Sequence, residues 1–130
     1  MIAIDTSAIL AIVLREPEAE TFGALIQAHR RVFIGAPTLF ELRMVTLGKF
    51  PEPVRAAVDA LALAAPIETI AFTAEHHLVA LDAFDRYGKG RHPASLNMGD
   101  CLSYAIAKIA DCPLLFKGND FGLTDIARVA

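Results

Sequence analysis

The stretch that decides the fold runs from Asn97 to Phe121 and reads NMGDCLSYAIAKIADCPLLFKGNDF. Asp100 stands at the start of an almost uncharged segment, Cys101 to Ala110. A segment this apolar all round predicts a helix that is buried between other elements. A short strand is expected at Leu114 to Phe116, and Asp120 follows it directly after a turn.

Geometry predicts that these two aspartates are neighbours in space. In a parallel α/β sheet a helix begins at the carboxyl edge, and the next strand returns to the same edge, where such folds place their ligand sites. Two other acids should arrive there as well. Asp5 follows the first apolar run of the chain, and Glu41 lies in the first turn of the helix after the second run. The sequence therefore predicts four carboxylates at one edge of the sheet: Asp5, Glu41, Asp100 and Asp120.

Working outward, apolar runs and helical segments alternate along the whole chain. Strands are expected at 1–4, 31–35, 66–72 and 114–116, with a possible edge strand at 126–129. Helices are expected at 8–14, 16–29, 39–49, 54–65, 74–87 and 101–110. This order predicts one α/β domain over residues 1–130, with a mostly parallel sheet covered by helices.

The composition narrows the class of protein. A hydrophobic content of 55% and a mean hydropathy of +0.45 are high, so either the helices are buried on several faces or a partner covers apolar surface. The net charge of −3 argues against a generic basic coat for nucleic acid. The N-terminal segment is apolar but short and interrupted by Asp5, so we expect neither a signal peptide nor a membrane span, and a cytoplasmic protein. Cys101 and Cys112 lack metal-ligand spacing and are expected to be small core residues.

Each acid also has an ordinary structural explanation. Asp5 and Asp120 could be turn residues, Asp100 could interact with a helix dipole, and Glu41 could form a capping box with Thr38. Four carboxylates at one edge are harder to explain in this way, because close carboxylates repel and need a compensating cation.

The residue types indicate which cation that would be. All the expected ligands are carboxylate oxygens, which suit Mg²⁺ or Mn²⁺ with bound waters. Asp5 and Asp100 are the expected direct ligands, and Glu41 and Asp120 would bind directly or through water. Polar support would come from three further residues, Thr6, Ser7 and Asn119. Such a site suits phosphodiester hydrolysis, and the cations that could help bind a polyanionic substrate are Lys89, Arg91, His92 and Lys117.

Four motifs resemble those of a PIN domain, specifically the VapC ribonuclease toxins of bacterial toxin–antitoxin pairs. They are MIAIDTSA, APTLFEL with Glu41, LNMGDCLSYAIA with Asp100 and LLFKGNDFGLTDI with Asp120. The resemblance implies a three-layer α/β/α sandwich and an endoribonuclease that depends on Mg²⁺ or Mn²⁺. It also implies a homodimer that is neutralised by a small antitoxin, with the helices between Glu16 and Ala65 as the expected contact surfaces.

Two other classes of function stay open at this point. A receiver-like phosphoryl signalling module would use Lys117 near the end of a late strand, but no phosphoacceptor aspartate follows the third strand. A metal-dependent phosphatase would use Asp5 as nucleophile, but the position two residues on is Ser7 in place of a second aspartate. The sequence does not indicate which RNA is cut or how many metal ions bind.

Overall fold

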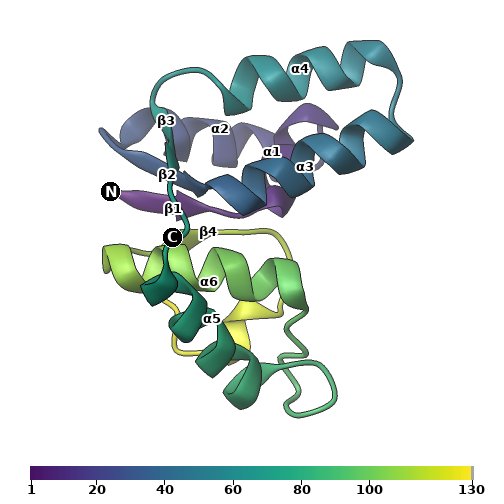
Figure 1. Cartoon of the computed structure of the whole chain (residues 1–130). Coiled ribbons are helices and arrows are strands. Elements are labelled where there is room, and N and C mark those ends of the chain that lie inside the picture. Colours follow the sequence, from purple (N-terminus) through teal and green to yellow (C-terminus); the bar gives the residue numbers. More distant parts are fainter. Residues whose placement is uncertain (130) are drawn as a thin grey trace.

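The computed structural model describes residues 1–129 and has a parallel sheet between two layers of helices (Figure 1). The strands, in the spatial order β3-β2-β1-β4, are β1 (Ile2–Ile4), β2 (Val32–Gly35), β3 (Ile67–Ile70) and β4 (Leu114–Leu115). The helices are α1 (Thr6–Val13), α2 (Ala19–Ala28), α3 (Ala36–Lys49), α4 (Glu52–Ala62), α5 (Ala74–Tyr87), α6 (Met98–Ala110) and the short 3-10 helix η1 (Phe121–Leu123). The predicted α/β fold with a parallel central sheet is confirmed.

The two layers follow from the alternation of side chains along β1. Ile2 and Ile4 face one core together with α1, α2 and α4, whereas Ala3 faces a second core with α5 and α6. Successive side chains of a strand point to opposite faces, so a strand with helices on both faces must be apolar throughout. All three residues of β1 are buried.

Helix α6 is buried between other elements, as its composition predicts. It packs against α5 and against the sheet, and its buried residues include Cys101, Tyr104 and Ile106. Its approach to β2 is close: a Cβ atom added at Gly35 would lie 2.8 Å from Cγ1 of Ile106. Glycine at the end of β2 thus lets α6 lie directly against the edge where the carboxylates were predicted. Cys112 is half-buried at the end of this helix, and both cysteines are free thiols.

Two local predictions were wrong. Helix α3 begins at Ala36, so Thr38 lies inside it and forms no capping box with Glu41. The hydroxyl of Thr38 is buried and has no hydrogen-bond partner among residues 1–129. The edge strand expected at 126–129 is reduced to an isolated parallel bridge between Leu114 and Arg128.

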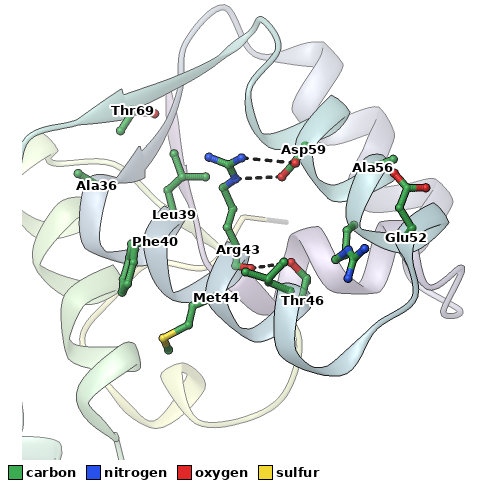
Figure 2. Close-up of a pocket in the computed structure, with 12 residues that line it drawn as sticks. Ala36, Leu39, Phe40, Arg43, Met44, Thr46, Glu52, Ala56, Asp59 and Thr69 are labelled. Atoms are coloured by element: carbon green, nitrogen blue, oxygen red, sulfur yellow. Dashed lines mark hydrogen bonds and ion pairs between the residues drawn. The ribbon is translucent and has the colours of Figure 1, made fainter.

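Helices α3 and α4 run side by side away from the sheet, as Figure 1 shows at its upper right. Between them lies a cavity of about 860 Å³, and Figure 2 shows its lining. Phe40, Met44 and Leu47 of α3 are 68%, 53% and 68% exposed. This apolar surface lies within the region that was expected to contact partners. In residues 1–129 no helix combines the length and apolar character needed to cross a bilayer.

Candidate active site

Asp5 is the buried centre of the site, only 6% exposed. It is the N-cap of α1, and its Oδ2 accepts hydrogen bonds from the Ser7 backbone N–H (3.1 Å) and the Ser7 hydroxyl (2.7 Å). Its Oδ1 accepts a 2.6 Å hydrogen bond from the hydroxyl of Ser103. The proposed turn role of Asp5 is therefore real, but it uses only one of the two carboxylate oxygens.

Asp100 is in the first turn of α6, three residues after the N-cap Asn97. The Asn97 side chain accepts from the Asp100 N–H at 2.9 Å, and Asp100 Oδ2 accepts from the Asn97 N–H at 3.0 Å. This reciprocal pair is a capping box, in which both residues satisfy helix donors that would otherwise lack partners. Capping fixes the start of α6 and so fixes where Asp100 enters the site.

Asp5, Glu41 and Asp100 line one cavity of about 210 Å³, together with Thr6, Asn97 and Gly99. The backbone of α6 approaches Glu41 closely. A Cβ atom added at Gly99 would lie 2.7 Å and 2.8 Å from the two carboxylate oxygens of Glu41. The structure thus brings together three of the four predicted acids, contributed by three segments that are far apart in the sequence.

The electrostatics of this cavity are those of crowded carboxylates. Burial, with further contributions from the charges of Asp5, Asp120 and Glu41, raises the pKa of Asp100 to about 6, even though the Asn97 N–H bond lowers it. Burial and the Asp5 charge also raise the pKa of Glu41. Raised pKa values mean that the ionised forms of both acids are destabilised where they stand.

Asp120 lies beside this cavity and not in its lining. It is the exposed residue that precedes η1, and its charge is close enough to act on Asp100. Asn119 is exposed next to it. Thr6 lines the cavity, and Ser7 holds Asp5. The hydroxyl of Ser7 also accepts the Lys117 backbone N–H at 3.0 Å, which ties the end of β4 to the start of α1.

None of the three cavity acids forms an ion pair within the described chain, residues 1–129. Across the same residues, no group of three or more His, Cys, Asp or Glu side chains lies close enough to hold a metal ion as it stands. Carboxylates that repel one another without a cation are expected to stand apart. The donor set, oxygen only and unpaired, fits Mg²⁺ or Mn²⁺ in its chemistry.

The predicted substrate-binding cations are distributed differently from the acids. The Lys117 ammonium pairs with Glu16 and lies 3.6 Å from Glu18, so it is directed away from the cavity acids. Arg91 pairs with Asp85 at 2.7 Å. His92 packs edge-on against Tyr87, and its Nδ1 accepts the Ala94 N–H at 3.0 Å. Lys89 is exposed in the same loop.

Ser103 and Gly99 were missed in the sequence. Ser103 is 2% exposed and reads as one of the small residues of an apolar helix. Its spacing was an available signal, because residues three apart on a helix share a face and Ser103 is three residues after Asp100. In the sequence, Gly99 indicated only where the helix begins, and no local pattern shows that it faces Glu41.

A family model described as the PIN domain matches residues 2–127 of the chain. The ribonuclease VapC30 of Mycobacterium tuberculosis is 43% identical over 127 residues, which cover 98% of this chain and 97% of the relative. A crystal structure of M. tuberculosis VapC20, described as a sarcin-ricin loop cleaving toxin, matches with a TM-score of 0.78 at 17% identity, over 99% of this chain and 98% of that one. A crystal structure of VapBC2 from Rickettsia felis, bound to a DNA fragment from its promoter, matches with a TM-score of 0.76 at 17% identity, over 100% and 98%.

Proposed function

Because the chain belongs to the PIN domain family and, within it, to the VapC ribonucleases, we propose that it is a metal-dependent endoribonuclease and the toxin of a toxin–antitoxin pair. One observation supports the chemistry most strongly. Asp5, Glu41 and Asp100 line one cavity, and none of them is neutralised by a cation of the described chain, residues 1–129.

The residues would divide the work as follows. Asp5 presents a carboxylate whose two oxygens are both held by hydroxyl groups, and Asp100 presents one from the capped start of α6. These two would hold the metal, and Glu41 would complete the cavity opposite Gly99. When bound, Mg²⁺ or Mn²⁺ supplies charge stabilisation to the phosphodiester and lowers the pKa of a water. Asp120, at the rim, is proposed to act through water.

The substrate is proposed to be single-stranded RNA, because the relatives are named ribonucleases and sequence-specific RNA recognition uses unpaired bases. Among the predicted cations we propose Lys89 as a phosphate contact, because it is exposed and forms no ion pair within residues 1–129, whereas Arg91 and Lys117 have acidic partners. The position of Lys117 also argues against the receiver-like alternative, which needs that ammonium among the acids.

The partners are proposed to be a small antitoxin and a second copy of the chain. Two exposed apolar surfaces support this proposal. The first is the groove between α3 and α4, around Phe40 and Met44 (Figure 2). The second was not expected from the sequence and lies on α5 and the start of α6, where Leu78, Leu81 and Met98 are 63%, 58% and 75% exposed.

The test is cleavage of single-stranded RNA by the purified chain with Mg²⁺ or Mn²⁺. We expect Asp5→Asn to reduce cleavage by more than about 100-fold without unfolding the chain, since changes to residues that only orient the metal ligands already cost about 10- to 100-fold. EDTA should have the same effect, and Asp82→Asn, on the exposed face of α5, is the matched control. Cleavage that survives both Asp5→Asn and EDTA would contradict the proposal.

A further inference from the structure

We infer that Ser103 is a positioning residue for the reaction: it fixes the plane of the Asp5 carboxylate, which would hold the metal together with Asp100. The inference rests on the proposed function and deepens it, because it concerns how the same site is built.

The hydrogen bonds of Asp5 are divided unequally between its two oxygens. Oδ2 accepts from the N–H and the hydroxyl of Ser7, whereas within residues 1–129 Oδ1 accepts from Ser103 alone. A carboxylate oxygen offers about two acceptor positions. Oδ2 is therefore saturated, and Oδ1 keeps one position for a further positive partner.

Ser103 is needed because the hydrogen bonds from Ser7 alone would still allow the Asp5 carboxylate to rotate about its terminal torsion. The terminal torsion of an aspartate is broad and roughly two-fold, so donors on a single oxygen allow the carboxylate plane to swing. A second donor on the other oxygen, from a different element, removes that freedom. The Ser103 bond of 2.6 Å has the length of a charge-assisted O–H···O⁻ hydrogen bond, the stronger kind.

Helix α6 fixes the position of the Asp5 carboxylate relative to Asp100. Ser103 and Asp100 are three residues apart, so they lie on one face of one helix. Ser103 is 2% exposed in the packed part of α6, and its hydroxyl has little room to take another orientation. A single rigid element thus carries Asp100 and also sets the orientation of Asp5 relative to it.

Because Asp5 is buried, the loss of the Ser103 hydrogen bond would be unfavourable. At 6% exposure, an oxygen that lost its donor would have little water to replace it. Without Ser103, we expect the carboxylate to rotate toward whatever donor it can reach, and its distance from Asp100 would no longer be fixed.

The experiment compares Ser103→Ala with Ser103→Thr, which keeps the hydroxyl. The matched control is Thr38→Val, because Thr38 is also a buried hydroxyl, on the helix that carries Glu41, but has no hydrogen-bond partner among residues 1–129. For each variant, three quantities are measured: Mn²⁺ affinity by calorimetry or electron paramagnetic resonance without RNA, kcat and KM for RNA cleavage, and the fraction folded.

We expect Ser103→Ala to weaken Mn²⁺ binding and to lower kcat, each by about 10- to 100-fold, the range found when residues that orient metal ligands are changed. KM for RNA and the folded fraction should stay near the wild-type values. Ser103→Thr should restore both losses, and Thr38→Val should cause neither.

The inference is overturned if Ser103→Ala binds Mn²⁺ and cuts RNA like the wild type, or if its losses only follow a loss of folded protein. It is also overturned if Thr38→Val causes equal losses. These outcomes leave the proposed function intact, because the wild type still binds metal and cleaves. A wild-type chain that neither binds Mn²⁺ nor cuts RNA contradicts the proposed function, and the role of Ser103 with it.

Discussion

Hydroxyl groups of helix α6 donate hydrogen bonds to two aspartates. One of these aspartates also has positively charged partners within residues 1–129, and the other does not. Ser103 donates to Asp5 at 2.6 Å, and the next residue, Tyr104, donates to Asp125 at the same distance. Asp125 is also paired with Lys108 at 2.8 Å, and Arg86 lies 3.6 Å away. Asp5 has no cation of the described chain, residues 1–129, and its charged neighbours are Glu41 and Asp100.

The pKa values record the same difference. Burial pushes the pKa of Asp125 upward, but the bonds from Lys108 and Tyr104 outweigh it and the pKa lies below its ordinary value. Burial and neighbouring carboxylates instead raise the pKa of Asp100 to about 6. Asp125 is thus held by the chain's own lysine and arginine side chains. Acids that the chain buries together without such partners cost stability, and perturbed groups of this kind mark functional sites.

The largest expected effect is the opposite behaviour of Asp100→Asn, which should lose RNA cleavage, and Asp125→Asn, which should lose stability. Asp100→Asn should reduce RNA cleavage by more than about 100-fold, because a proposed metal ligand is lost. Asp125→Asn should leave cleavage per folded molecule unchanged. It should lower the free energy of unfolding by about 1–3 kcal/mol, because Lys108 and Tyr104 lose a charged partner.

Measuring the cleavage rate and the urea denaturation of both variants under the same conditions tests this difference between them. If Asp125→Asn cut RNA as poorly as Asp100→Asn at equal folded fraction, the division of the acids into structural and functional groups would be wrong.

An intermediate effect is expected from the backbone of α6. Gly99→Ala places a Cβ against the carboxylate of Glu41, which is the movable end of a side chain, so the fold should survive while that carboxylate is displaced. We expect kcat/KM for RNA to fall by roughly 10- to 100-fold, the cost of a displacement of about 1 Å in an active site.

Gly48→Ala in α3 is the control for this change, because nothing lies within 4 Å of a Cβ added there. It should leave cleavage unchanged and raise the free energy of unfolding by roughly 0.5–1 kcal/mol, the helix preference for alanine over glycine. Equal cleavage by Gly99→Ala and the wild type would mean that the position of Glu41 does not matter for the reaction.

The smallest expected effect is on stability as a function of pH without metal. Asp100 has a folded pKa of about 6 against an ordinary value of 3.8, so the folded state binds more protons than the unfolded state between these values. The free energy of unfolding contributed by Asp100 therefore falls as pH rises through this window. Asp125 has a lowered pKa and behaves oppositely: its contribution is present above the ordinary value and is lost as pH falls through the folded pKa.

At pH 7 in EDTA, Asp100→Asn should be as stable as the wild type or more stable, by on the order of 1 kcal/mol after allowance for partial exposure. At pH 4 this advantage should disappear. Thermal unfolding of both proteins at the two pH values provides the measurement. A loss of several kcal/mol in Asp100→Asn would instead mean that the capping box with Asn97 is the main role of Asp100.

Much of the fold was predictable because its signals are local. Apolar runs of strand length and helical segments alternate, and a parallel sheet brings strand ends and helix starts to one edge whatever the packing details. That rule brought Asp5, Glu41 and Asp100 together from the sequence. It also predicted Asp120 nearby, although the structure places Asp120 beside the cavity and outside its lining.

The predictions from local sequence were less accurate where two structural explanations fitted the same residues. Thr38 and Glu41 have the spacing of a capping box, but α3 begins earlier, at Ala36, and Thr38 is buried inside it. Lys117 follows a strand near the acids, as a phosphate-binding lysine would, but its ammonium pairs with Glu16. The direction of a long side chain depends on which partners surround it, and the sequence alone does not list them.

The sequence by itself determined the class of fold, the edge of the sheet that carries the site and the acids that meet there, because these depend on period and order along the chain. Only the tertiary structure decided which oxygen of Asp5 is saturated, which hydroxyl holds the other and which glycine lies against Glu41. Asp5 and Ser103 are separated by 98 positions in the chain, and their contact depends on how α6 is rotated against the sheet. That rotation is set by packing around Gly35 and Ile106, which no local pattern encodes.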